Sequence, residues 1–201
     1  EWLLDNADVD GNWCLVHATH ITDQECHDLA HSGAIVGLCP TTEGNLGDGI
    51  FPLAQFMEEG GRFAIGSDSN TSVNPVEEIR WLEYVQRLHH QSRNVSAKPQ
   101  DRSTGSSLYR TCVQGGAKAL GRKVGKLETG YSADIVILDT DTPLLAHTPD
   151  EFLLDTFVFG GNTSTVKDVF IGGECVVKDY CHKEEEQIKR EFIQIIKKYR
   201  H

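Results

Sequence analysis

Nearly continuous apolar runs alternate with amphipathic stretches from the start of the chain to about residue 91. Three of the runs predict strands, at 12–17, 34–39 and 62–67. Three amphipathic stretches predict helices, at 23–32, 52–59 and 74–90. Strands and helices that alternate at this length form a parallel sheet with crossover helices, and a strand that is apolar throughout is covered on both faces. The expected fold class is therefore α/β, with a glycine-rich loop at 40–51.

The pattern changes in the second half of the chain. Residues 92–103 are polar and predict a linker or mobile loop, and 105–120 predict a further helix. Three later strands alternate more between apolar and polar positions, at 133–139, 165–172 and 174–178. Gly172 and Gly173 separate the last two, which is a hairpin signal. We therefore expect a small antiparallel sheet with one exposed face.

The tail of the chain predicts an amphipathic helix at 183–199. Ile188, Phe192 and Ile195 share one face of it, acidic residues stand at its start and basic residues at its end. This order of charges complements the helix dipole. We expect the helix to dock on the rest of the chain, and binding to a partner is the alternative.

Composition excludes several classes of function. The chain has 201 residues, with 19 Lys+Arg against 30 Asp+Glu and a net charge of −11. An acidic chain without a basic run binds phosphate backbones poorly, so nucleic acid is not expected as a partner. No apolar run approaches the ~20 residues that span a bilayer, so no membrane association is expected. The six cysteines form no CxxC pair and indicate small core residues in a reducing, cytoplasmic compartment.

Polar side chains follow each of the first three predicted strands. His17 and His20 follow the first strand, residues 41–45 the second, and Asp68 the third. The carboxyl ends of parallel strands meet at one edge, where the ligand sites of α/β folds lie. We therefore expect a site at this edge. Two residues of the middle group are candidates either for its lining or for the surface, Glu43 and Asn45.

His17 and Asp68 together indicate a metal-centred site. An unpaired carboxylate in the mouth of an apolar sheet is costly to desolvate, so Asp68 should need a cation. An imidazole at a strand end can ligate a divalent metal, bond to its water or carry a proton. The alternative is that both residues are structural. A catalytic zinc takes three or four protein ligands, so His17 and Asp68 alone cannot complete the site. The other histidines fall on predicted helices, in loops or in the tail and are not expected to be ligands: His27, His31, His89, His90, His147, His182 and His201.

Three features in this order resemble the C-terminal half of the amidohydrolase superfamily. The first is a strand followed by His-x-x-His from position 17, and the second is a strand followed by Gly-Ser-Asp ending at Asp68. The third is Gly-x-Leu-x-x-Gly-x-x-Ala-Asp-Ile-Val-x-x-Asp at 125–139. Longer segments narrow the resemblance to the formimidoylglutamate deiminases: LVHATH at 15–20, TTEGNLGDGIFP at 41–52 and GSDSNTSVNPVEEIRWLEYVQRL at 66–88.

The resemblance implies a (β/α)8 TIM-type barrel joined to a small β-sandwich. Residues 1–121 would form the C-terminal half of a metal-dependent hydrolase barrel, 122–180 sandwich strands and 181–201 a C-terminal helix. A complete barrel needs about 250 residues, so this chain would hold only the last strands and helices of one. The chain also opens at Glu1 without an initiator Met, which indicates a missing beginning.

The resemblance further implies zinc-dependent hydrolysis of a C–N bond, the deimination of N-formimino-L-glutamate to N-formyl-L-glutamate and ammonia. Asp68 matches the aspartate that binds zinc and takes a proton from the attacking water. His17 matches a histidine that orients the water or the developing charge, and that is itself a metal ligand in relatives with two metals. His20 would be structural or lie further from the metal. The remaining zinc ligands and the acid-base glutamate are absent from this chain, which puts activity of the chain alone in doubt.

The expected partners are a small-molecule substrate and a second protein surface. An incomplete barrel leaves strand edges open, so a homodimer or association with a missing N-terminal half is expected. Two alternative functions remain open from the sequence. One is another deaminase of the superfamily, acting on a purine, triazine or adenosyl substrate, and the other is a non-catalytic piece that needs its missing half.

Overall fold

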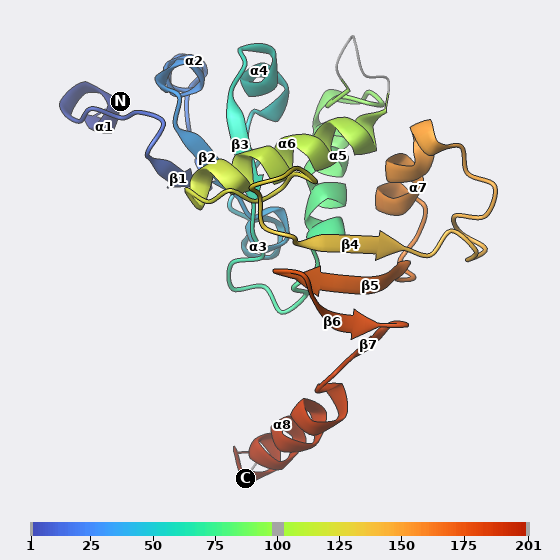
Figure 1. The fold of residues 1–201 in the computed structure, drawn as a ribbon. Coiled ribbons are helices and arrows are strands. Elements are labelled where there is room, and N and C mark those ends of the chain that lie inside the picture. Colours follow the sequence, from blue (N-terminus) through green and yellow to red (C-terminus); the bar gives the residue numbers. More distant parts are fainter. Residues whose placement is uncertain (1, 98–102, 200–201) are drawn as a thin grey trace.

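The first half of the molecule contains the expected parallel sheet. A computed structural model describes residues 2–97 and 103–199, and its sheet has the strand order β1-β2-β3 (Figure 1). The strands are β1 (Cys14–Val16), β2 (Ile35–Leu38) and β3 (Arg62–Ile65). Both pairings are parallel, and their carboxyl-end register joins Val16 to Gly37 and Leu38 to Ile65. The three strands therefore end at one edge, as predicted.

Helices follow each of these strands at the predicted places. They are α2 (Asp23–Ser32), α4 (Leu53–Glu58), α5 (Pro75–His90) and α6 (Thr104–Ala119). A capping box formed by Thr22 and Glu25 begins α2, and Gly33 with a φ of 82° ends it. The Asn74 side chain accepts two backbone N–H groups at the start of α5. Local capping thus fixes where the helices begin and end relative to the sheet.

One hydrophobic core joins the parallel sheet to its helices. Its side chains come from strands β2 and β3 and from helices α4, α5 and α6, and include Val36, Leu38, Phe63, Leu53, Phe56, Ile79, Leu82, Leu108 and Cys112. Helix α6 lies directly on β3 because Gly115 has no side chain there. A Cβ at Gly115 would overlap the backbone carbonyl of Phe63.

The second half carries the predicted antiparallel sheet, with the strand order β4-β5-β6-β7 (Figure 1). The strands are β4 (Ile135–Leu138), β5 (Val166–Ile171), β6 (Glu174–Lys178) and the unpredicted β7 (Cys181–His182). Gly172 and Gly173 form the turn between β5 and β6 with φ values of 58° and 86°. Their left-handed backbone is the reason that glycines separate these two strands. The division of the chain at residue 121 into a barrel part and a sandwich part stays a prediction.

Two helices occur where the sequence pattern predicted none. The glycine-rich segment at 40–51 was expected to be a loop, but Pro40–Leu46 forms α3. Pro40 stands at the first helical position and Gly47 ends the helix in a left-handed conformation, so both are end signals of a helix. Further along, a 3-10 turn (Asp150–Phe152) leads into α7 (Leu153–Phe159), which packs on α5 and α6. A short helix, α1 (Trp2–Asn6), opens the described chain.

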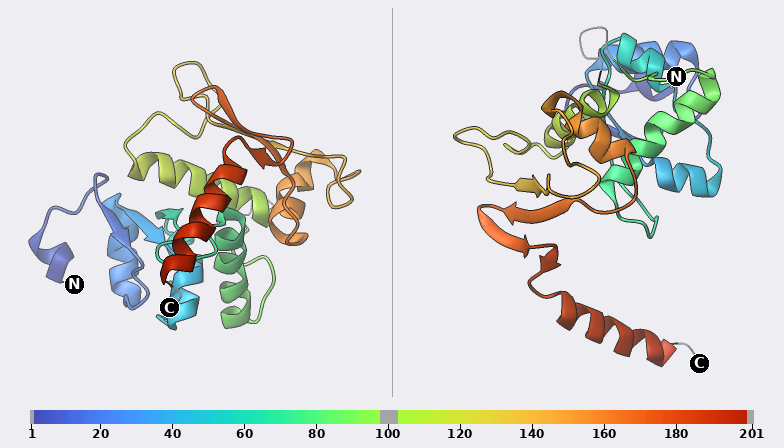
Figure 2. Two further views of the ribbon diagram at one scale, coloured as in Figure 1. Left: turned by 90° about the horizontal axis from the view of Figure 1, so that it is seen from below. Right: turned by 90° about the vertical axis from the view of Figure 1, so that its right-hand side faces the viewer.

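The tail helix forms, but it does not dock. Helix α8 (Glu185–Tyr199) has no buried residue, and Figures 1 and 2 show it extending away from both sheets. Its apolar side chains Ile188, Phe192 and Ile195 are exposed. The expectation of a docked helix is therefore wrong for the described residues, because the apolar stripe of α8 stays exposed.

The remaining expectations concern cysteines, the linker and membranes. All six cysteines are free thiols, of which Cys26, Cys39 and Cys112 are buried while Cys14 and Cys181 are exposed. Of the predicted linker at 92–103, residues 98–102 lie outside the described residues. Within the two described ranges, no helix combines the length and the apolar character that crossing a bilayer requires.

Candidate functional site

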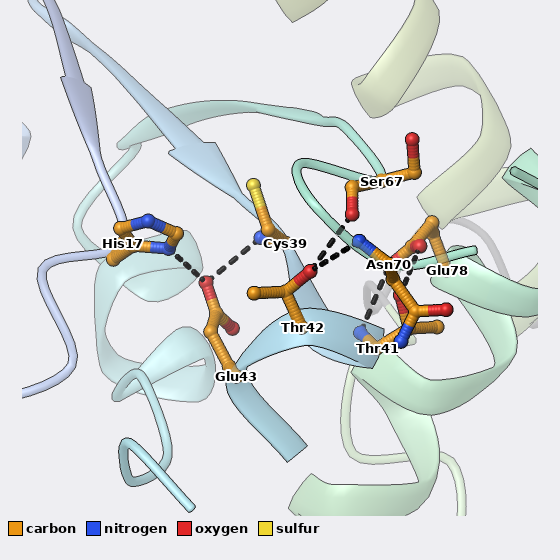
Figure 3. A network of polar contacts seen from close by, with 8 residues as sticks. All are labelled: His17, Cys39, Thr41, Thr42, Glu43, Ser67, Asn70 and Glu78. Carbon is orange, nitrogen blue, oxygen red and sulfur yellow. Dashed lines mark hydrogen bonds and ion pairs between the residues drawn. The ribbon is translucent and has the colours of Figure 1, made fainter. Parts of the chain in front are cut away.

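A buried carboxylate lies at the carboxyl edge of the parallel sheet. Glu43 belongs to the first turn of α3, which begins directly after β2, and its side chain is almost fully buried. One carboxylate oxygen, Oε1, accepts the backbone N–H of Cys39 at 2.8 Å, across the start of the same helix. Helix α3 therefore turns Glu43 back toward the strand end and fixes the position of its oxygen (Figure 3).

His17 contacts this carboxylate from the neighbouring strand. Its Nδ1 lies 3.1 Å from Glu43 Oε1 (Figure 3). An ionised carboxylate only accepts hydrogen bonds, so Nδ1 carries a proton, and in the neutral ring Nε2 is the nitrogen with the free lone pair. The His17 backbone has a φ of 68°, and its N–H donates to Gly37 O at 2.8 Å. The side chain is 37% exposed, so the imidazole is held on one side and open on the other.

A second set of contacts joins the end of β3 to α3. Thr42 Oγ1 donates to Ser67 O at 2.8 Å and accepts the Asn70 N–H at 3.2 Å (Figure 3). Thr42 is buried, so its hydroxyl fixes the loop after β3 against the helix after β2. We call the carboxyl edge of the parallel sheet, with the residues that surround it, the rim. The loop after β3 carries Asp68, and the position of this loop relative to the rim depends on these two bonds.

A second buried carboxylate lies behind the rim. Glu78 of α5 is 1% exposed and accepts both the backbone N–H of Thr41, at 3.0 Å, and the Thr41 hydroxyl. Burial raises the pKa of Glu78, against the lowering effect of the Thr41 bonds. The sequence analysis did not single out Glu78. Its only signal was its place within the 66–88 segment that carries the family resemblance.

Asp68 lies at the same edge but is exposed. It forms no hydrogen bond or ion pair with any described residue, and its backbone has a φ of 48°. The negative charge of Asp68 nevertheless acts on Cys39. The pKa of the Cys39 thiol is raised to about 11, first by burial and then by the carboxylates of Glu43, Asp68 and Glu78. The expectation that Asp68 is desolvated is wrong for the described chain, because a turn beyond β3 carries it outward. Glu43 and Glu78 are the desolvated carboxylates instead.

Three possible metal donors come together at the rim. One ligand atom from each of His17, Cys39 and Glu43 lies within 4.8 Å of the others. His17 and Asp68, whose left-handed backbones have φ values of 68° and 48°, also lie here, and such backbone strain is concentrated at functional sites. The sequence analysis missed Cys39, because an apolar run that ends in cysteine is more often part of a core.

The other candidates lie elsewhere. His20 and Asn45 are exposed, so the pocket-lining alternative for Asn45 has no support from the described contacts. His27, His31, His89 and His90 lie on helices as predicted, while His147 is in a loop and His182 in β7. His201 lies outside the described residues.

Comparison with known proteins identifies the family. The model of the Amidohydrolase family matches residues 1–176. The chain belongs to the amidohydrolase family. It is 46% identical, over 98% of its length, to formimidoylglutamate deiminase of Pseudomonas aeruginosa. Two solved structures have the same fold: an amidohydrolase from Brucella melitensis (TM-score 0.88, 43% identity over 96% of this chain) and an adenosine deaminase from Xanthomonas campestris with bound zinc (TM-score 0.81, 22% identity over 96%).

This amidohydrolase chain spans less than half of the length of these relatives. It covers 43% of the Pseudomonas protein, 42% of the Brucella chain and 43% of the Xanthomonas chain. The rim described above is therefore one part of the corresponding region in proteins more than twice as long.

Proposed function

We propose that this chain is the C-terminal portion of a metal-dependent hydrolase that deiminates N-formimino-L-glutamate to N-formyl-L-glutamate and ammonia. The single observation that carries the proposal is the 46% identity to a formimidoylglutamate deiminase over 98% of the chain. The parallel strands, the polar rim at their carboxyl ends and the family membership support it. The chain covers 43% of that relative, so the whole activity is proposed for the longer polypeptide.

The same relationship supports the finer fold. We infer that β1, β2 and β3 are the last strands of a (β/α)8 barrel, and that the antiparallel strands belong to a small sandwich. A parallel sheet of three strands with helices on its outside is what a sector of such a barrel contains. The free edges of β1 and β3 would pair with strands from the missing half or from a second copy.

The residues at the rim fit a divalent cation. Asp68 is a carboxylate without a partner among the described residues, and His17 offers an unprotonated Nε2 on its open side. These donor types suit zinc, and we propose Asp68 as the metal ligand within this chain. Such a cation, when bound, would make a nucleophile available from water near neutral pH. The further ligands would come from outside this chain.

The chemistry then divides between two side chains. Asp68 would take the first proton that water loses as its oxygen bonds to the formimino carbon, and would pass it to the formimino nitrogen. The proton of the resulting hydroxyl would follow to the same nitrogen as the C–N bond breaks and ammonia departs. His17, held at Nδ1 by Glu43, would accept a hydrogen bond from the water at Nε2, and with Nε2 protonated it would donate instead to the negative charge that develops on the substrate. Glu43 would position this imidazole.

Replacement of Asp68 by asparagine tests the proposal. In the full-length polypeptide that contains this chain, Asp68→Asn should reduce ammonia release from N-formimino-L-glutamate by far more than tenfold, because the amide cannot accept the proton. Folding should be unaffected, since Asp68 is exposed and unpaired among the described residues. Ammonia release, measured beside circular dichroism, gives both quantities.

Ser69→Ala is the matched control, because Ser69 is the exposed neighbour in the same turn. It should keep the native rate. Retention of more than about a tenth of the rate in Asp68→Asn, a barrier change below roughly 1.4 kcal/mol, would reject Asp68 as the proton carrier. Turnover of adenosyl or triazine compounds, with none of N-formimino-L-glutamate, would reject the proposed substrate.

A further inference from the structure

A second group of metal-binding side chains lies away from the rim. It consists of His27 and His31 of α2 and Glu59, which follows α4. One ligand atom from each lies within 4.8 Å of the others. Glu59 Oε2 is 2.9 Å from Nδ1 of His27 and 3.9 Å from Nδ1 of His31. We call these three residues the α2–α4 cluster.

The two histidines share one face of their helix. Residues four apart on an α-helix are neighbours along the same stripe, and the two imidazole centroids are 4.3 Å apart. Their side chains are 50% and 57% exposed, so an ion from solvent can reach both rings. Neither ring is needed to fill the core.

The His31 ring is held in place by a hydrogen bond within α2. His31 Nδ1 lies 2.8 Å from the backbone carbonyl of His27, and a carbonyl only accepts, so Nδ1 carries the proton. The lone pair of His31 is then on Nε2. Metal-ligating histidines ordinarily donate their other N–H to a carbonyl or a carboxylate in this way.

The carboxylate of Glu59 has one hydrogen-bonded oxygen and one oxygen without a hydrogen bond among the described residues. Gln55 donates to Glu59 Oε1 at 3.0 Å and thereby fixes the carboxylate. The other oxygen, Oε2, is buried and has no hydrogen-bond partner among the described residues, although it is close to His27. A buried carboxylate oxygen without a hydrogen bond is costly, and a cation would satisfy it.

We propose that the α2–α4 cluster is a binding site for one divalent transition-metal ion of the zinc type. Two imidazoles and one carboxylate are borderline donors that suit Zn²⁺, Co²⁺ or Ni²⁺ rather than Mg²⁺ or Ca²⁺, which prefer oxygen ligands. Three protein ligands leave one tetrahedral position for water. A simple ion pair would use only one of the two histidines, whereas a metal ion would use both.

The α2–α4 cluster lies at the opposite end of the sheet from the rim. His31 stands in the last turn of α2, just before β2 begins, and Glu59 stands just before β3 begins. Both therefore belong to the amino ends of the strands, whereas His17 and Asp68 follow the carboxyl ends. A bound ion would cross-link α2 to the end of α4 and would stabilise the fold instead of taking part in hydrolysis.

The test is a metal titration of the full-length polypeptide after removal of bound metal by a chelator. Calorimetric titration with Zn²⁺, and the visible absorption of Co²⁺, should show a site that disappears in His27→Ala and in His31→Ala. Glu59→Gln, which keeps the shape of the side chain, should weaken Zn²⁺ binding by at least about tenfold. Zn²⁺ should also raise the thermal midpoint of the native protein by more than that of the histidine variants, which keep the rim but lose the α2–α4 cluster, because only the folded state has the site.

Adjacent histidines provide the matched control. His89 and His90 of α5 are exposed and their ring centroids are 4.8 Å apart, but they belong to no cluster of three metal-binding side chains among the described residues, so the double variant His89→Ala/His90→Ala should leave the titration unchanged. Circular dichroism confirms that each variant is folded. Absence of zinc binding, or zinc binding that persists unchanged in His27→Ala and His31→Ala, overturns the proposal. Because Asp68 and His17 are intact in every variant, this outcome is independent of the proposed hydrolysis.

Discussion

Glu78 shows how a single buried carboxylate organises the back of the rim. It accepts two hydrogen bonds from Thr41, so it holds the first turn of α3 against α5. Burial nevertheless raises its pKa, which means that the folded chain binds a proton more tightly than the unfolded chain does. The stability of the protein is therefore linked to pH through this residue.

We expect Glu78→Gln to remove this linkage. The folded state retains the proton of Glu78 at pH values where the unfolded state has lost it. The ordinary pKa of a glutamate is 4.5, so the contribution of Glu78 to stability falls as the pH rises from 4.5 toward the raised pKa of the folded state. The difference in unfolding free energy between wild type and Glu78→Gln should decrease over this window, by at most about 1.4 kcal/mol for each pH unit. Urea denaturation at a series of pH values measures it.

Glu58→Gln, at an exposed carboxylate at the end of α4, is the comparison for loss of a surface charge. If wild type instead gained stability over Glu78→Gln with rising pH, the Thr41 bonds would outweigh burial, and the pKa of Glu78 would be lowered in the folded state.

At the residue scale the sequence predicted only part of the rim. His17 and Asp68 could be chosen because each follows an apolar run, and both do lie at the carboxyl edge. The contacts of Glu43 with His17 and of Glu78 with Thr41 join residues 26 and 37 positions apart. A local sequence pattern cannot predict contacts between residues so far apart in the chain, because these contacts depend on how α3 and α5 pack on the sheet.

At the scale of single elements, two adjacent glycines of α6 have opposite surroundings. Gly115 faces β3, where an added Cβ would overlap the backbone of Phe63. At Gly116 a Cβ would meet no atom within 4 Å. The same substitution should therefore act in opposite directions at the two positions.

Gly115→Ala should destabilise the protein by about 1–3 kcal/mol or more, because α6 must move away from the sheet. Gly116→Ala should stabilise it by about 0.5–1 kcal/mol, because alanine restricts the unfolded chain and favours the helix. Chemical denaturation of both variants measures the two changes. Equal effects at the two positions would show that α6 does not pack on β3 as described.

The elements that the sequence missed have a common cause. In α3, the Gly44 within Pro40–Leu46 weakens the helical pattern, and tertiary contacts through Thr41 and Glu43 compensate for it. Helix α7 is only seven residues long and apolar on several sides, so it has no clear periodicity. The long strands and helices with caps were predictable, whereas these short elements depend on their neighbours.

At the scale of the whole molecule, α8 is separate from the rest. None of its residues is buried, whereas Leu108 of α6 is fully buried in the core. A helix that buries nothing against the described chain contributes little to its stability.

A chain that ends at Lys183 should therefore keep the thermal midpoint of the 201-residue chain within about 2 °C. Leu108→Ala should lower the midpoint much more, because removing this core side chain costs about 2–5 kcal/mol. Thermal unfolding followed by circular dichroism compares the two. A large fall in the midpoint on truncation would show that α8 docks on the sheets after all.

The strands of the parallel sheet all run in the same direction, and its two outer strands leave free edges. The outer strands β1 and β3 each pair with β2 alone among the described strands, and all three point the same way. A second copy that continued the sheet in parallel would set its β1 beside the β3 of the first, which is a head-to-tail contact without a two-fold axis. Such growth does not stop at two molecules. Isolated chains are thus expected to form open-ended polymers through pairing of β1 with β3 of the next copy. Strands that paired with both free edges would prevent this polymerisation.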